Sequence, residues 1–168
     1  LSDFGLARSV TSDDKKLTEY VAPGWRTAPE ILLGSTQYSK ADDMWSVGCI
    51  LAELLLGKTL FQATSTLNQL EKIFELTGKP TPEDIESMES PHAAMVISSL
   101  NISEKINFNN LFPSASETGL DFLQKLLVFN PQQRLTAEEA LQHPYVQQFS
   151  VPKEEIISHS LMKIPFDD

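Results

Sequence analysis

The 168-residue sequence has little cysteine, few cationic side chains and no long apolar run. Its one cysteine, Cys49, excludes a disulfide framework and a cysteine-based metal cluster, and favours the cytoplasm or the nucleus. The most apolar run, residues 44–57, is too short to span a bilayer and contains Glu53. The sequence begins Leu1-Ser2-Asp3, without an initiator methionine or a signal peptide, which predicts a fragment.

The balance of charge is strongly acidic. Aspartate and glutamate outnumber lysine and arginine by 23 to 13, and the formal net charge is −10. Such a surface repels phosphate backbones and anionic headgroups, so we expect neither nucleic acid nor a membrane as a partner. A basic peptide or protein is a better partner. Because 41% of the residues are hydrophobic, the chain can bury the core of one ordinary globular domain.

Helix signals dominate the chain, and no run of alternating apolar and polar residues predicts a strand. The predicted fold class is therefore mainly α. We expect a central helix over about 40–56, because Ser39 and Asp42 have the spacing of a capping box and Gly57 is a stop signal. This helix is apolar nearly all round, which is typical of a helix at the centre of a larger core.

A second helix is predicted over about 65–76, closed by Gly78. Four apolar residues are expected on its buried side: Leu67, Leu70, Ile73 and Phe74.

The last part of the chain predicts two more helices. One covers about 117–129 and stops before Pro131, because the residue ahead of a proline leaves the helical region. The other starts at the capping residue Thr136 and ends before Pro144. Between the second and third helices we expect residues 79–116 to be irregular, apart from one short helix that begins at 81–84.

Several motifs follow one another in a fixed order. A single tripeptide such as Asp-Phe-Gly recurs by chance, but independent motifs that agree are informative. In chain order they are Asp3-Phe4-Gly5, Thr18-Glu19-Tyr20, Ala28-Pro29-Glu30, the segment Asp43-Met44-Trp45-Ser46-Val47-Gly48, and Arg134 before the last helix.

This ordered set resembles the C-terminal lobe of a protein kinase. The Thr-Glu-Tyr sequence is similar to the activation loop of the mitogen-activated protein kinases. Residues 64–71 and 127–131 are similar to the atypical extracellular-signal-regulated branch of that group. The resemblance covers nearly the whole chain.

The resemblance implies a partial kinase domain over 1–149 and a C-terminal extension over 150–168. Within the domain it implies an activation segment (3–30), the central helix (about 40–56), a family insert (about 79–116) and the last helices (about 117–142). In the family, the glycine-rich loop, the ATP-contacting lysine and the catalytic loop all precede the Asp-Phe-Gly motif. No catalytic residue is therefore expected in this chain, which alone is not catalytically complete.

The resemblance also assigns roles to the first motifs. Asp3 corresponds to the aspartate that binds magnesium, and Phe4 and Gly5 to the packing and hinge positions beside it. Thr18 and Tyr20 correspond to the two hydroxyls that are phosphorylated on activation. Phosphates at these positions order a loop by pairing with arginines.

Other correspondences are structural. Glu30 and Arg134 match a buried ion pair that ties the end of the activation segment to the last helices. Asp43 matches an aspartate that holds the backbone of the catalytic loop. Asp167 and Asp168 fit an acidic docking surface for basic motifs, or are ordinary solvated charges of a tail.

The chain departs from the family in the loop that forms the substrate pocket, which comprises Val21, Ala22, Pro23, Gly24 and Trp25. Pro23 replaces a threonine whose hydroxyl contacts the catalytic aspartate. Gly24 and Thr27 replace two arginines that receive the phosphotyrosine, which leaves only Arg26 nearby. Two interpretations compete: a real alteration of the substrate clamp, or a local error in the underlying gene sequence. The second is slightly favoured, because only five residues are affected.

The resemblance implies a serine/threonine kinase of the mitogen-activated type that uses ATP and Mg²⁺. Its substrates would be protein Ser/Thr hydroxyls, before proline, and its partners would carry basic docking motifs. An upstream kinase or autophosphorylation would activate it. The alternative is a non-catalytic pseudokinase or docking module. As a free chain, the apolar side of the central helix would be uncovered, so we expect poor solubility or self-association.

Overall fold

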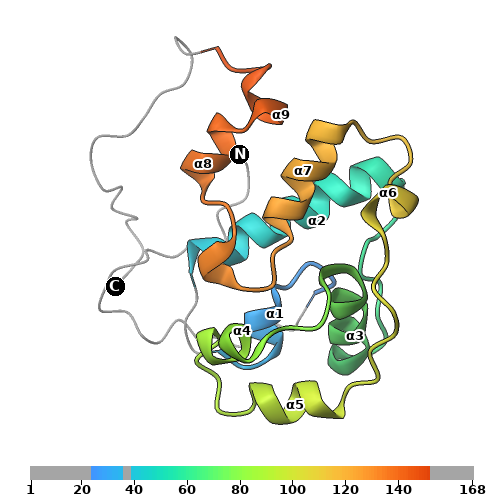
Figure 1. Ribbon diagram of the computed structural model, residues 1–168, viewed down its shortest axis with the longest axis vertical. Helices are drawn as coiled ribbons and strands as arrows, with labels where there is room; N and C mark the ends of the chain where they lie inside the picture. Colours follow the sequence, from blue (N-terminus) through green and yellow to red (C-terminus); the bar gives the residue numbers. More distant parts are fainter. Residues whose placement is uncertain (1–23, 36–38, 152–168) are drawn as a thin grey trace.

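The computed structural model describes residues 24–35 and 39–151, and all the regular structure within these ranges is helical (Figure 1). The expected fold class, mainly α, is confirmed for this part of the chain. The helices are α1 (Pro29–Leu32), α2 (Lys40–Leu56), α3 (Thr66–Thr77), α4 (Pro82–Ser87), α5 (Ala93–Ser99), α6 (Phe108–Leu111), α7 (Glu117–Leu126), the 3₁₀ turn η1 (Pro131–Gln133), α8 (Ala137–Gln142) and α9 (Pro144–Gln147).

The ends of α2 follow from its sequence as predicted. Ser39 accepts a hydrogen bond from the Ala41 N–H at 3.2 Å, and Asp42 accepts one from the Ser39 N–H at 2.6 Å, which completes the capping box. Gly57 ends the helix in the left-handed region, at φ 67°, where only glycine is unstrained. These two local signals fix the length of α2, the longest helix among the described residues.

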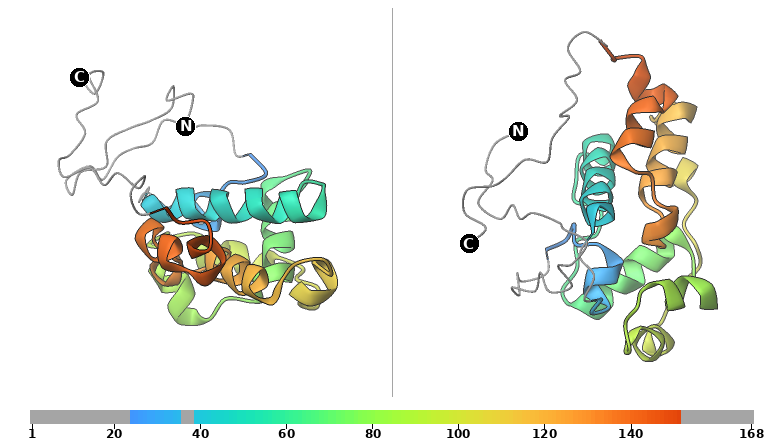
Figure 2. Two further views of the ribbon diagram at one scale, coloured as in Figure 1. Left: turned by 90° about the horizontal axis from the view of Figure 1, so that it is seen from above. Right: turned by 90° about the vertical axis from the view of Figure 1, so that its left-hand side faces the viewer.

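One side of α2 is buried and the other is exposed. Trp45, Cys49 and Ala52 are fully buried, and burial raises the pKa of the Cys49 thiol to about 12. Figure 2 shows α2 at one edge of the molecule, with the described helices packed on one side of it. On the opposite side, Ile50 and Leu54 keep 47% and 77% of their surface exposed. This agrees with the expectation that the apolar side of the central helix is uncovered in this chain, since no described residue covers it.

The close packing of α7 on α2 depends on Gly48. A Cβ atom built at this position would lie 2.9 Å from Leu127 Cδ2 and 3.0 Å from Leu126 Cβ, closer than real contacts allow. The missing side chain therefore lets the two helices approach. Beyond α7, α8 and α9 continue the same layer, whereas α1, α3, α4 and α5 form the other end of the molecule (Figure 1).

Three predictions about the elements need correction. Residues 79–116 contain the helices α5 and α6 as well as the expected α4, so they are not irregular. Helix α7 ends at Leu126 rather than near 129, because Leu127 leaves the helical region with φ −92° and ψ 45°. Leu67 is half exposed, since it lies in the first turn of α3, outside the buried stripe that Leu70 and Ile73 begin.

Other expectations about the elements are confirmed. Thr136 and Glu139 form a capping box at the start of α8, which ends at Gln142. Gly78 closes α3. No helix in the described ranges is both long and apolar enough to cross a membrane.

Candidate functional site

Glu30 and Arg134 lie 104 positions apart in the chain and form a buried, bidentate ion pair. The two guanidinium nitrogens donate to the two carboxylate oxygens at 2.8 and 3.0 Å, and the side chains are 3% and 0% exposed. Glu30 is placed by the first turn of α1, and Arg134 directly follows η1. The pair therefore joins the segment before α2 to the turn that precedes α8.

The guanidinium of Arg134 also binds three backbone carbonyls. Its Nε donates to the Val128 carbonyl at 3.0 Å, and its terminal nitrogens donate to the carbonyls of Ala41 and Phe129 at 2.6 and 3.2 Å. Together with Glu30, these contacts use all five N–H donors of the side chain. A buried charge that is fully paired in this way avoids the cost of an unsatisfied group.

Asp42, which sequence reasoning treats only as a helix cap, lies beside this pair. Its carboxyl is 4% exposed, and its Oδ1 atom has no hydrogen-bond partner among the described residues. Burial, aided by the neighbouring Glu30 carboxylate, raises the pKa of Asp42 to about 7, against the opposing effects of the hydrogen bond from the Ser39 N–H and of the Arg134 charge. Two acids and one base thus meet at the N-terminus of α2.

Asp43 takes the opposite position. It is exposed, whereas the preceding Asp42 is buried. The role that sequence assigns to it, holding the catalytic loop, concerns a segment that does not belong to the described residues, and it stays a prediction.

Residues 24–27 form a turn that closes on itself. The Thr27 N–H donates to the Gly24 carbonyl at 3.0 Å, and the Gly24 N–H donates to Thr27 Oγ1 at 2.8 Å. The two residues that stand where the family has arginines are therefore the two that close the turn. Neither offers a cation to a phosphate.

Three side-chain contacts fasten this turn to α2 and α3. Trp25 Nε1 donates to the Ala63 carbonyl at 3.0 Å, and Gln69 Nε2 donates to the Gly24 carbonyl at 3.0 Å. Arg26 binds Glu53 through Nε at 2.9 Å and through a terminal nitrogen at 2.5 Å. Arg26, the one cation left near the predicted phosphotyrosine position, is therefore already engaged by a carboxylate.

Many predicted site residues lie outside the described residues. These are Asp3, Phe4, Gly5, Thr18, Tyr20, Val21, Ala22, Pro23, Asp167 and Asp168. Within the described ranges, no group of three histidine, cysteine, aspartate or glutamate residues could hold a metal ion. The magnesium, phosphorylation and docking assignments therefore stay predictions.

Sequence reasoning misses the parts played by Asp42, Glu53 and Gln69. A signal is present for two of them, because an acidic residue inside an otherwise apolar helix needs a partner. From the sequence, Asp42 is predicted to be part of a helix cap, and Glu53 is a charged residue within an apolar run. The sequence does not predict which residues either one contacts. Gln69 carries no such signal, since a glutamine on a helix is ordinary.

Comparison with known proteins agrees with the motifs. The protein kinase domain family matches residues 1–146. Over 174 aligned positions the chain is 53% identical to extracellular signal-regulated kinase 2 of Dictyostelium discoideum, covering all of this chain and 47% of that protein. It is 52% identical to mitogen-activated protein kinase 15 of Xenopus laevis, covering all of this chain and 30% of that protein.

A solved structure shows the same fold. The MAP kinase LMAMPK10 from Leishmania major superposes with a TM-score of 0.70 at 38% identity. The match covers 77% of this chain and 42% of the other. The chain thus spans less than half the length of the relatives it matches here. With this agreement of motifs, sequence identity and fold, the chain belongs to the protein kinase domain family, with mitogen-activated protein kinases as its relatives.

Proposed function

We propose that this chain supplies the C-terminal lobe of a serine/threonine kinase of the mitogen-activated type. Such an enzyme passes the γ-phosphoryl group of ATP to a substrate hydroxyl, forming a phosphoester and ADP. The observation that carries the proposal is the identity of about half of all positions to kinases of this type along the whole chain. The order of the motifs supports it independently.

In this proposal the residues of the chain bind and orient. Asp3 would hold Mg²⁺, which would supply neutralisation of the charge on the transferred phosphate. The Glu30–Arg134 pair fastens the end of the activation segment to the last helices. The catalytic aspartate and asparagine belong to a segment upstream of this chain, so no chemical step is assigned to the described residues.

The loop over 21–25 forms the pocket for the residue that follows the target hydroxyl, which is proline in this proposal. The contacts of Gly24 with Gln69 of α3, and of Trp25 with Ala63 ahead of α3, support this role, because they hold the end of the loop in place. A loop end that is held in place favours selection of the substrate by steric fit.

Regulation and partners follow from the same family pattern. Thr18 and Tyr20 accept the activating phosphates, either from an upstream kinase or from the enzyme itself. Protein substrates and basic docking motifs are the partners, with Asp167 and Asp168 as part of the acidic docking surface. Cytoplasm and nucleus are the compartments that fit a protein with a single, buried cysteine.

A second candidate function is a non-catalytic docking module. The observation that favours it is the loss of the hydroxyl and of the two guanidinium groups at Pro23, Gly24 and Thr27. These losses remove the contacts by which kinases of this family fix the substrate and the phosphotyrosine.

A kinase assay separates the two functions. The protein is produced from its gene with the upstream sequence included, and is supplied with labelled ATP, Mg²⁺ and a Ser-Pro peptide or its Ser-Ala counterpart. We expect transfer to the Ser-Pro peptide, its loss in Asp3→Asn, and its retention in the matched variant Asp13→Asn. No transfer above the Asp3→Asn background would contradict the enzyme and favour the docking module.

A further inference from the structure

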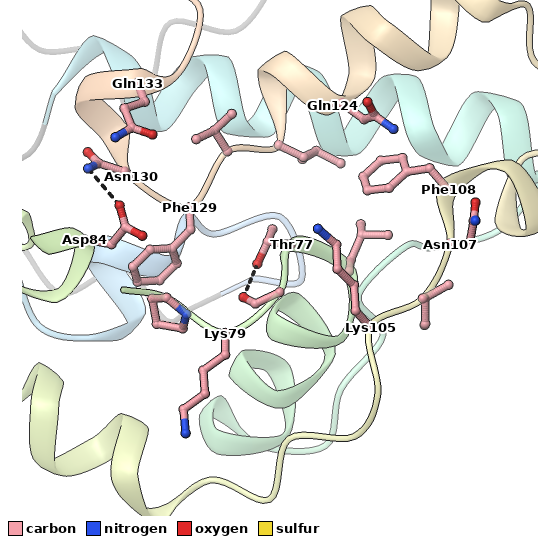
Figure 3. Close-up of a pocket in the computed structure, with 16 residues that line it drawn as sticks. Thr77, Lys79, Asp84, Lys105, Asn107, Phe108, Gln124, Phe129, Asn130 and Gln133 are labelled. Carbon is pink, nitrogen blue, oxygen red and sulfur yellow. Dashed lines mark hydrogen bonds between the residues drawn. The ribbon is translucent and has the colours of Figure 1, made fainter. Parts of the chain in front are cut away.

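Two adjoining hollows lie beside the insert (residues 79–116): the larger, shown in Figure 3, between α3, the insert and the end of α7, and the smaller between α3 and the insert. The larger has a volume of about 580 Å³ and runs between residues 76–80, 105–108 and 127–130. The smaller, of about 460 Å³, lies against residues 100–103. Gly78, Lys79 and Lys105 line both, so the hollows form one groove, here called the Lys105 groove. Each volume is in the range of known ligand sites.

The walls of the groove are held by contacts of their own. The Ile106 N–H donates to the Glu75 carbonyl at 2.7 Å, which pins the insert to α3. Phe129 packs against Phe74 with ring centres 5.2 Å apart, and Phe108 packs against Phe112 at 5.9 Å. The groove is therefore formed before any ligand arrives.

The groove carries unpaired positive charge. Neither the Lys79 nor the Lys105 side chain has an ion pair or hydrogen bond within the described ranges. In Figure 3 the ammonium group of Lys105 points into the larger hollow, whereas that of Lys79 points away from it. The side chain of Lys105 runs past Gly78, where a Cβ atom would lie 3.4 Å from its Cδ.

The carboxylate on the walls of the groove does not neutralise these lysines. Among the described residues that line the two hollows, Asp84 is the one acidic side chain. It accepts hydrogen bonds from the Thr81 N–H at 3.0 Å and from Asn130 Nδ2 at 3.1 Å. Asp84 stays ionised under these hydrogen bonds but forms no ion pair with either lysine, so two lysines and one aspartate leave the groove with net positive charge and the Lys105 ammonium group faces open space.

The positive charge of the groove stands out because the rest of the chain is acidic. At net −10, the chain as a whole repels an acidic ligand, so such a ligand is held only where cations and a shaped surface coincide. The two hollows adjoin and open to solvent, which suits an extended segment that places successive side chains in them. Apolar surface in the larger hollow comes from Ile106, which is 38% exposed, whereas the lining residues Leu76 and Leu127 are buried.

We propose that the Lys105 groove docks an acidic, extended segment of a partner protein. An apolar side chain of that segment fills the larger hollow beside Ile106 and Phe108, where one carboxylate meets the Lys105 ammonium group, and a second carboxylate meets the exposed ammonium group of Lys79 outside that hollow. This docking surface is distinct from the predicted acidic docking residues Asp167 and Asp168, and it does not depend on phosphoryl transfer.

The test is direct binding of a defined probe to the full 168-residue chain. The probe is the fluorescein-labelled peptide EDFEDL, followed by fluorescence anisotropy at low and at moderate salt. EDSEDS and KKFKKL, with the same label, are the control peptides. The double variant Lys79→Glu/Lys105→Glu is compared with Lys40→Glu/Lys58→Glu, which makes the same change in charge at exposed lysines outside the groove.

We expect saturable binding of EDFEDL that weakens as salt rises and that is at least about tenfold weaker in the groove variant. The control variant keeps its affinity within about twofold, and EDSEDS binds at least about tenfold more weakly than EDFEDL. If the groove variant is unfolded by circular dichroism, Lys105→Met, which keeps the aliphatic stem, replaces it. Equal loss in both double variants, or no saturation up to about 1 mM peptide, overturns the proposal.

Two further outcomes also overturn it. Stronger binding of KKFKKL than of EDFEDL would show that the acidic surface, not the groove, recognises peptides. Loss of self-association in the groove variant, without peptide binding by the unchanged chain, would make a second copy of this chain the occupant.

Discussion

Arg134 shows how one residue can tie distant parts of this lobe together. Its guanidinium group lies 5.1 Å from the ring centre of Trp45 while its N–H groups bind Glu30 and three carbonyls. Removing it would leave the Glu30 carboxylate buried without a partner, and the carbonyls would lose their donors. The cost of breaking such a pair is larger than the net gain of forming it.

We therefore expect Arg134→Ala to lower the free energy of unfolding by roughly 3–5 kcal/mol, measured by urea denaturation. Arg26→Ala is the matched control, because Arg26 also pairs with a glutamate but is 55% exposed. It should cost at most about 1 kcal/mol. Equal, small losses in the two variants would contradict the structural role given to the Glu30–Arg134 pair.

Asp42 makes the stability of the lobe depend on pH. Its pKa of about 7 in the folded chain lies above the ordinary value of 3.8, so the folded state holds a proton that the unfolded state has lost. This contribution to stability is complete below about pH 4 and is lost as the pH rises through about 7. Asp84 and Asp121 have lowered pKa values and act in the opposite sense, at more acidic pH.

Asp42→Asn should remove this dependence between about pH 4.5 and about pH 8, because the titration of Asp42 in the folded chain lies inside that range. Thermal unfolding of the two proteins across this range measures it. The difference in midpoint between the Asp42→Asn variant and the unchanged chain should grow in favour of the variant as pH rises. Parallel curves would show that Asp42 does not hold the extra proton.

At the scale of the helices, the packing of α7 on α2 depends on the close approach that Gly48 allows. Gly48→Ala gains roughly 1 kcal/mol of helix propensity, but its Cβ would lie 2.9 Å from Leu127. Forcing the helices apart costs about 1–3 kcal/mol, so we expect a net loss of stability in thermal unfolding. Gly24→Ala is the control, since nothing lies within 4 Å of its added Cβ. A more stable Gly48→Ala variant would show that α2 and α7 are not in close contact.

Local signals make some elements predictable and leave others hidden. The ends of α2 and α8 depend on caps within four residues, which a sequence displays directly. Helix α5 is stabilised instead by the contact of Ala93 and Ile97 with a cluster that contains Leu70 and Phe74 of α3. A short helix held by partners about twenty positions away has no comparable local signal.

The contacts of the candidate site likewise could not be predicted from local sequence. The partnership of Glu30 with Arg134 is expected only from resemblance to kinases, because nothing in either local sequence specifies the other. The burial of Asp42 depends on where α1 and η1 place that pair. The groove around Lys105 arises from three segments that come together only in the fold, so sequence reasoning gives no sign of it.

At the scale of the whole molecule, the exposed side of α2 is the main liability. Val47, Ile50 and Leu54 form an apolar stripe on this side, and Trp25 is also half exposed. Contiguous apolar surface of this kind promotes association.

We expect the 168-residue chain to self-associate in sedimentation velocity as its concentration rises. Ile50→Lys/Leu54→Lys should shift it toward the monomer by charging the stripe. Met95→Lys/Leu141→Lys makes the same change at exposed apolar residues on α5 and α8 and should leave association unchanged. A monomeric, cooperatively unfolding unchanged chain would contradict the importance of the stripe.

In the proposed function, this lobe is part of an active kinase domain. The decisive test is to sequence the transcript upstream of Leu1 and across the codons for residues 23–27. We expect a nucleotide-binding lobe and a catalytic loop with its aspartate and asparagine, in frame with Leu1. A frame that lacks these two residues while confirming Pro23, Gly24 and Thr27 would contradict the enzyme and leave a docking module in its place.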